Sequence, residues 1–368
     1  MTHAHGQAPR RRRRPKWFII IPASLVILAI LGGIGWGALQ FFGQLNVNDY
    51  EGNGTGEAVV TVRAGDTACG GINTALQEAG VIKDASVFCS YVLEQESEPI
   101  FQVGSYRLKK EMSSEAALRA LLDPANKIQL TATIIEGWTA QQAFKKISEV
   151  TGIPVEEFET AALDYAAFGV PADAPSIEGF LFPATYEFEP DQNAQQIIQI
   201  MVDRMMQSLN SLGVPEEDRL EIVTMASIIQ REAGSHPEDF FKVSRVFWNR
   251  LNPDLWPTAL LQSDATVHYG LGDTDSVWTD NAERADKSNP YNTYANPGLP
   301  IGPIGLPGDL ALEAAVNPIE GPWFYFVTVN LATGETAFSE TEAQHDRARA
   351  QLAEWCTASR ARGEAYCD

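Results

Sequence analysis

The sequence predicts a mixed α+β protein with a single N-terminal transmembrane helix, a small α/β subdomain and a larger mixed α/β domain with long loops. Three observations lead to this fold class. A charge-free apolar segment stands near the N-terminus, short β-branched runs and helical periodicities alternate after it, and Pro, Gly and Asn crowd the stretch 252–308. With 368 residues, 45% of them hydrophobic and 20% charged, the chain is long enough for two or three globular domains.

The apolar segment Trp17–Phe42 contains no charged residue, and a helix of about 20 such residues spans the hydrocarbon core of a bilayer. A signal peptide is the alternative, but its apolar centre is shorter, about 7–15 residues, and a cleavage site follows it. Arg10–Arg14 and Lys16 precede the segment. The positive-inside rule therefore predicts a single-pass cell-membrane protein with residues 1–16 in the cytoplasm and residues 43–368 outside.

The formal net charge of −21 is distributed unevenly. Residues 1–16 hold six of the 27 basic residues and no acid, so the remainder carries 21 basic against 48 acidic residues, a net charge of −27. A duplex nucleic-acid binder needs a cationic face to neutralise phosphates. The sequence therefore predicts no nucleic-acid partner.

The four cysteines fall into two sequence-local pairs, Cys69 with Cys89 and Cys356 with Cys367. No CxxC motif or histidine spacing accompanies them, so they do not form a metal-ligand set. In an oxidising extracytoplasmic space, two local disulfides are the natural interpretation, and four buried free thiols are the alternative.

A polar, Gly-rich linker is expected at 43–57, followed by a small subdomain at 58–127. The subdomain is predicted as a β-α-α-β unit, with a β-branched strand at Ala58–Arg63 and a return strand at Gly104–Leu108. Gly80 follows a helical periodicity and is expected to end that helix. A last helix, EAALRALL, follows a serine cap and ends near Pro124.

The larger domain is expected at 128–345 and a C-terminal tail with a disulfide at 346–368. The domain begins with the strand-like run IQLTATII. Its strongest helical stretches are 193–211 and 215–234, and residues 342–358 read as a final polar helix. Long irregular loops are expected in 252–308, where binding residues usually gather.

Glu232 is the carboxyl group that the helical periodicity singles out. It lies about 20° from Met225, on the flank of the apolar stripe of 215–234, and just before Gly234, a candidate C′ residue. Apolar surroundings would raise its pKa and keep it protonated near neutrality, as a general acid requires. The alternative is a glutamate in the last helical turn that reaches solvent.

Three loops combine amides, hydroxyls, carboxyls and aromatic rings, which are the groups that bind sugars: Ser176–Gly179, Leu261–Asp264 and Tyr291–Tyr294. Rival chemistries lack support, because the sequence has no GxSxG, HExxH, P-loop or strand-linked GxGxxG motif. The histidines at 236, 268 and 345 are isolated from one another. We therefore predict no metal and no cofactor.

Eight distinctive motifs follow one another along the chain. They are IIEGWTAQQ (134–142), EGFLFPATYEF (178–188), MASIIQREAG (225–234), VFWNRL (246–251), LLQSDATVHYGLG (260–272), NPYNTYANPGLPIGPIGLPG (289–308), LEAAVNPIEGPWFYFV (312–327) and FSETEAQH (338–345). In this order they closely resemble the endolytic murein (peptidoglycan) transglycosylase family, also called YceG-like, and the resemblance extends over about residues 58–345. The segment 58–82 is similar to a LysM-like module, which would be either a spacer or a glycan-contacting unit.

The resemblance implies a membrane-anchored enzyme with a LysM-like subdomain, which cuts nascent peptidoglycan strands and leaves 1,6-anhydro-MurNAc ends. It also implies peptidoglycan synthases as partners. The catalytic glutamate of the family falls on Glu232, whereas the first acid of the family motif is replaced by Gln230. By the same match, the residues expected to line the glycan cleft are Gln262, Ser263, Asp264, Tyr291, Asn292, Tyr294 and Asn317, with Glu178 bracing the site.

Three alternatives remain open at this point. Glu178 and Asp264 could be purely structural loop anchors. The protein could be a peptidoglycan-binding scaffold that has lost catalysis, as the replacement at Gln230 suggests. It could also be an ordinary hydrolase, for which Asp264 or Glu178 would have to act as a second carboxylate near Glu232.

Overall fold

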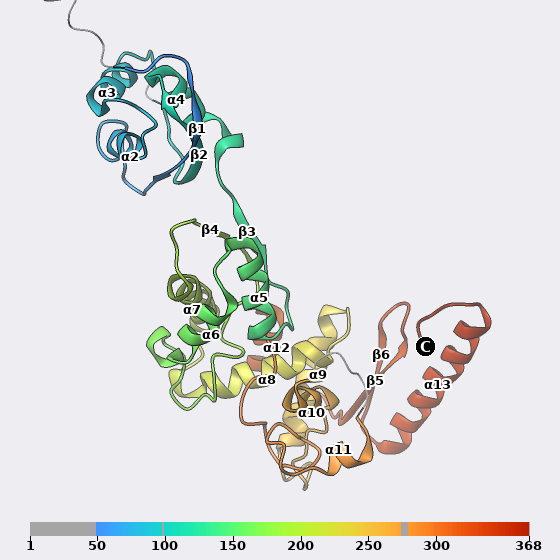
Figure 1. Cartoon of the computed structure of the whole chain (residues 1–368). Helices are drawn as coiled ribbons and strands as arrows, with labels where there is room; N and C mark the ends of the chain where they lie inside the picture. Colours follow the sequence, from blue (N-terminus) through green and yellow to red (C-terminus); the bar gives the residue numbers. More distant parts are fainter. Residues whose placement is uncertain (1–48, 98, 274–278, 368) are drawn as a thin grey trace, which may run out of the picture. The chain divides into compact units, whose positions relative to one another are not determined.

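The computed structural model describes residues 49–97, 99–273 and 279–367 (Figure 1). The predicted cytoplasmic segment and transmembrane helix lie outside these residues. Among the helices that the structure does describe, none is both long and apolar enough to cross a membrane. The chain divides into two compact units, with the boundary between Ile128 and Gln129. The fold is mixed α+β, as predicted, with three two-stranded antiparallel sheets in the described residues.

The first unit is built on one antiparallel hairpin. Its strands pair from Asn53 opposite Met112 to Val62 opposite Gly104, and the side chains of Val60 and Val62 alternate into the core. Ser113 caps the last helix through its hydroxyl, and Gly80 adopts φ 70° after the first helix, both as predicted. The elements in order are β1 (Asn53–Val62), α2 (Ile72–Glu78), α3 (Ala85–Leu93), β2 (Gly104–Met112), α4 (Ser114–Leu122) and η1 (Pro124–Asn126).

The first strand begins earlier than the sequence predicts. Part of the expected linker belongs to β1, which starts at Asn53 rather than Ala58. Gly54 has φ 72° and lies against the Lys110 carbonyl, where a Cβ atom would clash at 2.3 Å. The polar composition of 43–57 predicted a linker without strand pairing. Glycine at position 54 instead allows the two strands to pair closely.

Both predicted disulfides are present, and no described cysteine is free. Cys69–Cys89 links the loop before α2 to helix α3. Because this bond closes a loop within the first unit, it restricts the unfolded chain of a unit with a small core.

The second unit opens with β3 (Leu130–Thr133), which pairs with β4 (Thr185–Phe188). A Thr139–Gln142 capping box begins helix α5, and an Asn193–Gln196 capping box begins α7. Apolar faces of these helices pack on the sheet and on each other. The helices of this part are α5 (Ala140–Thr151), α6 (Val155–Ala162), the short η2 (Tyr165–Phe168) and α7 (Ala194–Ser211).

Helix α8 (Arg219–Glu232) lies within the main core, where every residue from Val223 to Ile229 is buried. The short turn η3 (Glu216–Asp218) precedes it, so the expected helix 215–234 is present with a 3₁₀ first turn. It packs against the neighbouring helices α9 (Pro237–Leu251), α10 (Asp264–Leu271) and α12 (Asp309–Val316). The expected glycine C-cap at Gly234 is wrong, because Ala233 leaves the helix in an extended conformation instead.

Helix α9 organises the irregular segment 314–324 through side-chain donors. This segment lacks regular structure over most of its length, so its carbonyl groups need partners from elsewhere. Consecutive turns of α9 supply them. The donors are Ser244 to Ala314, Arg245 to Pro318 and Ile319, Trp248 to Ala315, Asn249 to Gly321 and Trp323, and Arg250 to Phe324.

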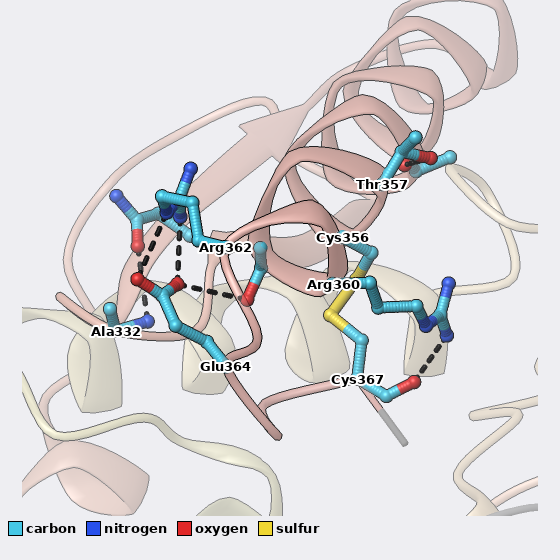
Figure 2. Close-up of a disulfide and its surroundings, with 10 residues drawn as sticks. Ala332, Cys356, Thr357, Arg360, Arg362, Glu364 and Cys367 are labelled. Atoms are coloured by element: carbon cyan, nitrogen blue, oxygen red, sulfur yellow. Dashed lines mark hydrogen bonds and ion pairs between the residues drawn. A yellow bond between two sulfur atoms is a disulfide. The ribbon is translucent and has the colours of Figure 1, made fainter.

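The C-terminal part consists of the hairpin β5 (Tyr325–Asn330) and β6 (Glu335–Ser339), followed by α13 (Glu342–Ala361), which packs on both strands. The final polar helix was predicted three residues shorter. Figure 2 shows how the tail is held: Cys367 is bonded to Cys356 of α13, and Arg360 donates to the Cys367 carbonyl.

The stretch 252–308 is mostly irregular, as predicted, but it contains helix α10 and the five-residue helix α11 (Asn281–Ala285). An Asp280–Glu283 capping box supports α11. These two short helices carry or hold several of the predicted site residues.

Candidate active site

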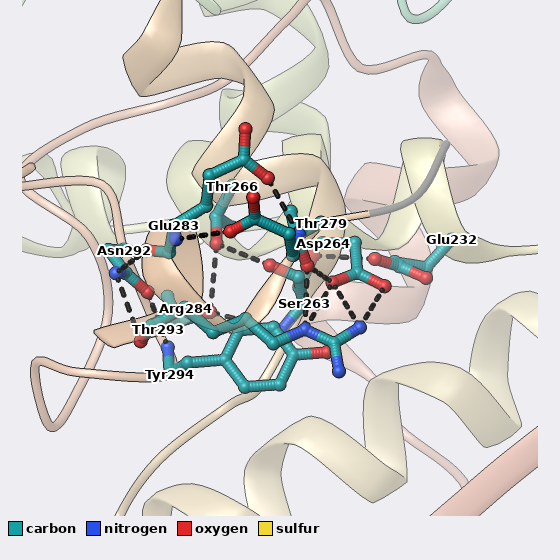
Figure 3. Close-up of polar contacts among 11 residues, drawn as sticks. Glu232, Ser263, Asp264, Thr266, Thr279, Glu283, Arg284, Asn292, Thr293 and Tyr294 are labelled. Carbon is teal, nitrogen blue, oxygen red and sulfur yellow. Dashed lines mark hydrogen bonds and ion pairs between the residues drawn. The ribbon is translucent and has the colours of Figure 1, made fainter. Parts of the chain in front are cut away.

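Glu232 is the last residue of α8, and Ser263 precedes the first residue of α10. The Ser263 hydroxyl donates to Oε1 of Glu232 at 2.5 Å (Figure 3). Glu232 is partly buried rather than fully extended into solvent. The structure therefore favours the half-buried carboxyl over a solvent-reaching glutamate.

The pKa of Glu232 is raised above its ordinary value, chiefly because burial disfavours the charged form. The Ser263 hydrogen bond lowers the pKa, the negative charge of Asp264 raises it, and the positive charges of Arg250 and Arg231 lower it. The carboxyl also stands at the C-terminal end of a helix, where the partial negative charge of the backbone disfavours ionisation. Burial and the position at the end of the helix thus both favour the protonated form of Glu232.

The loop that carries Ser263 is held from two sides. The Thr293 hydroxyl accepts the Ser263 backbone N–H at 3.0 Å, and the Thr293 carbonyl accepts that of Gln262 at 3.1 Å. The Thr266 hydroxyl donates to the Ser263 carbonyl. Gln262 itself adopts φ 57°, a left-handed conformation that is unusual for a residue with a side chain. Such strain persists only where surrounding contacts enforce it, and it is common at active sites.

Asp264, the first residue of α10, forms a partly exposed ion pair with Arg284 beside Glu232. Arg284 of α11 donates to both of its oxygens, at 3.0 and 3.2 Å, and Thr279 also donates to it. The Arg284 guanidinium lies over the ring of Tyr294, 4.6 Å from the ring centre. Figure 3 shows these groups beside Glu232. Asp264 and Tyr294 therefore lie near the acid, with Asp264 engaged by protein donors. Their expected place in a glycan cleft stays a prediction.

Glu178 braces the helices around the site. It is buried, its carboxylate accepts the Ala140 N–H of α5 at 3.0 and 3.1 Å, and the Tyr269 hydroxyl of α10 donates to it at 3.1 Å. Burial raises the pKa of Glu178 to about 7. The predicted residue Tyr291 packs edge to face against Tyr269. Because Glu178 and Tyr291 both contact Tyr269 of α10, both residues support this helix.

Asn292 requires a correction. Its side chain is fully buried, and its amide donates to the carbonyls of Glu283, Arg284 and Asp286. Because all these partners are backbone groups of the α11 segment, Asn292 holds a loop in shape and does not line a cleft.

Asn317 requires a second correction. The start of α12 is tied to the end of α8, because the Gly308 N–H donates to Gln230. The end of α12 lies beside the start of α8, where Val316, Asp218 and Ile222 line a common hollow. Asn317 caps this far end of α12 and therefore lies at the opposite end of α8 from Glu232.

Gln230 has a structural explanation. Its amide group donates to Glu136 at 3.1 Å, while its carbonyl accepts the Gly308 N–H at 3.0 Å. A glutamate could accept the backbone N–H but would place a second carboxylate against Glu136. The residue thus ties α8 to two neighbouring loops and leaves the acid at Glu232 unaffected.

Several residues of the site were not singled out from the sequence. They are Arg250, Thr266, Tyr269, Thr279, Arg284 and Thr293. Two signals could have pointed to them. A half-buried carboxylate such as Asp264 needs donors, of which arginine is the strongest. The carbonyls of irregular segments need donors too, such as the arginines and hydroxyls of neighbouring helices.

The model of the YceG-like family matches residues 60–351, which is most of the chain. The protein belongs to the YceG-like family. The match includes Glu232 and the loops that hold it, and it ends before the disulfide of the tail.

Curated relatives of this YceG-like protein are named endolytic murein transglycosylase. The one from Streptococcus pneumoniae serotype 2 is 28% identical over 309 residues, covering 75% of this chain and 55% of that protein. The one from Bacillus subtilis strain 168 is 30% identical over 300 residues, covering 76% of this chain and 80% of that protein. The chain thus spans about half the length of the pneumococcal relatives. A yceG-like protein from Listeria monocytogenes, solved at 2.6 Å, is similar in structure, with a TM-score of 0.51, 29% identity, and coverage of 80% of this chain and 99% of that one.

Proposed function

We propose that the protein is an endolytic lytic transglycosylase that cleaves the MurNAc-β-1,4-GlcNAc bond of nascent peptidoglycan strands, leaves 1,6-anhydro-MurNAc ends and so terminates glycan elongation. The observation that carries the proposal is the half-buried Glu232 at the end of α8, with a raised pKa and a Ser263 donor. Membership of the YceG-like family and the names of the curated relatives support the substrate class.

The proposed reaction needs one carboxyl group. Protonated Glu232 donates its proton to the glycosidic oxygen as the bond from that oxygen to C1 breaks, which leaves a 4-hydroxyl on GlcNAc. The resulting carboxylate accepts the proton of the MurNAc 6-hydroxyl while this oxygen bonds to C1. Glu232 ends protonated again, and no water is consumed. The attacking hydroxyl is already tethered to the reacting sugar, which gives the step an intramolecular advantage.

Ser263 supports both stages of this cycle. A hydroxyl that donates to Glu232 stabilises the carboxylate formed in the first stage, and it can hold the protonated acid in the same position. Asp264 disfavours the carboxylate electrostatically, while Arg250 favours it. Opposing charges of this kind keep an acid able both to give and to take a proton near neutral pH.

The test is digestion of purified glycan strands, with mass spectrometry of the new ends. We expect 1,6-anhydro-MurNAc termini from the wild-type protein and a loss of rate of about 10²-fold or more in Glu232→Gln, which keeps the shape but removes the acid. Glu187→Gln, a change at an exposed carboxylate on β4, serves as the control. Undiminished product from Glu232→Gln would sink the assignment.

The same experiment separates the rival functions. Reducing MurNAc ends would indicate hydrolysis, which needs a second carboxylate near the first. The protein donors already bound to Asp264 and Glu178 argue against either in that role. Peptidoglycan binding without cleavage would indicate a scaffold. The scaffold alternative was suggested by the replacement at Gln230, and the structural contacts of Gln230 explain that replacement without a loss of catalysis.

We also propose that Trp17–Phe42 anchors the enzyme in the cell membrane, with residues 43–368 on the outer side, where nascent glycan is made. Peptidoglycan synthases are the proposed partners, since a strand-terminating enzyme must reach the strand while it is being polymerised. Co-purification of the full-length membrane protein with a synthase tests this, and a failure to co-purify after cross-linking would count against it.

A further inference from the structure

Arg250 links three parts of the second unit that meet near Glu232. The residue is only 7% exposed, and it projects from the last turn of α9. Its Nε donates to the Phe324 carbonyl at 2.8 Å, at the entrance to β5, and its Nη1 donates to the Leu261 carbonyl. One guanidinium thus ties α9 to two loop segments far apart in sequence.

The Leu261 contact acts next to the strained part of the Ser263 loop. Gln262 follows Leu261 directly and has φ 57°, and Ser263 follows Gln262. A left-handed residue persists when contacts fix the backbone on both sides of it. Here the Arg250 guanidinium fixes the carbonyl before Gln262, and Thr293 fixes the N–H groups of Gln262 and Ser263. The position of the Ser263 hydroxyl therefore depends on Arg250.

The charge of Arg250 also acts on Glu232. The groups that act on the Glu232 carboxyl are Ser263 and Asp264 around the start of α10, Arg231 on α8 itself and Arg250 on α9. Arg250 in turn is acted on by Tyr294, Glu232 and Tyr325, and it influences His345. It also lies over the rings of Trp256 and Tyr325, at 5.6 and 5.7 Å from their centres, which shield it from water.

We propose that Arg250 is a positioning residue for Glu232: it holds the Leu261 carbonyl so that Ser263 points its hydroxyl at the carboxyl group, and its buried cation stabilises the carboxylate once the proton has left. The inference rests on the proposed role of Glu232 as the acid. A charge this far inside the protein is screened little by water, so its effect on a nearby carboxylate exceeds that of a surface cation.

Arg245 provides a matched control on the same helix. It too is an arginine that donates to irregular backbone, at the Pro318 and Ile319 carbonyls, but it is not among the charges that act on Glu232. Replacing either arginine removes carbonyl contacts of segment 314–324. Only replacement of Arg250 removes a cation beside the acid.

The first measurement follows the Glu232 carboxyl by NMR in full-length protein labelled with ¹³C-carboxyl glutamate, assigned with Glu232→Gln. We expect the titration midpoint of Glu232 to rise in Arg250→Gln and to stay at the wild-type value in Arg245→Gln. Equal midpoints in the two variants would overturn the inference. The titration needs no turnover. An absence of anhydro product would therefore contradict the proposed function, whereas the effect of Arg250 on the titration of Glu232 would still be measured independently.

The second measurement is turnover of glycan strands. Arg250→Lys keeps the charge but is expected to lose one of the two carbonyl contacts, so the Ser263 loop loses part of its support and we expect turnover to fall about tenfold. Arg245→Lys should keep wild-type turnover. If Arg250→Gln does not fold, the comparison of Arg250→Lys with Arg245→Lys tests the positioning role instead. Equal turnover in these two variants would refute that role.

Discussion

At the scale of single residues, the site depends on carboxyl groups whose protonated form burial favours. Glu232 and Glu178 both have raised pKa values because burial disfavours their charged forms, yet they have different surroundings. Glu232 faces a hydroxyl and charges of both signs. Glu178 is enclosed by the Ala140 N–H and the Tyr269 hydroxyl, so it acts as a support.

Glu178 should make the protein less stable as pH rises. Its pKa is raised from 4.5 to about 7 in the folded protein, so folding favours the protonated form. The resulting stabilisation is fully present below pH 4.5 and is lost as pH rises through 7; its size is about 3 kcal/mol. We expect urea denaturation to show wild type losing this much relative to Glu178→Gln between pH 4.5 and 8.

The control for this measurement is Glu187→Gln, a change at an exposed carboxylate on β4. Its stability should follow that of the wild type across the same pH range. Parallel pH dependence in wild type and Glu178→Gln would show that Glu178 does not carry the effect.

At the scale of elements, most helices and strands could be predicted from periodicity and capping residues. The helices of the first unit, α7 and α8 follow their apolar spacing closely, and α13 was predicted as a polar helix to within three residues of its end. What failed depended on partners distant in sequence. The early start of β1 depends on close pairing at Gly54, and the end of α8 depends on the extended Ala233. Neither the pairing at Gly54 nor the conformation of Ala233 can be predicted from the composition of its segment.

The candidate site shows the same division. Glu232 could be singled out because its helical position is a local property. Ser263 and Asp264 were proposed from the polar loop Leu261–Asp264 and from the family resemblance. Asn317 was misplaced because the direction of α12 along α8 is a tertiary fact. Arg250 was missed because its role appears only when α9 is packed against 314–324.

The Cys69–Cys89 disulfide should stabilise only the first unit, to which both cysteines belong. The buried hydrophobic residues form two clusters, one in each unit, so we expect two unfolding transitions by calorimetry. Replacing Cys69 and Cys89 by alanine should lower the stability of the first unit by about 3 kcal/mol, because the bond closes a loop of 20 residues.

The matched control replaces Cys356 and Cys367 by alanine. This bond ties the end of α13 to the tail, so its loss should leave the transition of the first unit unchanged. An equal shift of both transitions on removing Cys69–Cys89 would mean that the units do not unfold separately.

At the scale of the whole molecule, charge is divided along the chain. The first 16 residues carry six cations, and the remainder carries a net charge of −27. Under the proposed topology these two parts lie on opposite sides of the membrane. Segments with this many acidic residues repel anionic polymers at low salt, an effect that screening limits to about 8 Å at physiological ionic strength.

The proposed topology can be tested with reporter fusions in cells. Alkaline phosphatase, which is active only outside the cytoplasm, should be active when fused after Glu57. Replacing Arg10–Arg14 and Lys16 by uncharged residues should reduce this activity, because those cations orient the span. Full activity of a phosphatase fused before Trp17, or release of the mature protein by cleavage, would contradict a single-pass anchor.

The depth of Arg250 has one more consequence. Surface ion pairs weaken as salt is added, whereas a guanidinium held between two carbonyls and two aromatic rings is shielded from mobile ions. The protonation of Glu232 should therefore change little with ionic strength, even where the binding of a charged polymer to the acidic exterior changes strongly. An enzyme built in this way could work in surroundings of fluctuating salt, because substrate capture would respond to the medium while the acid itself would not.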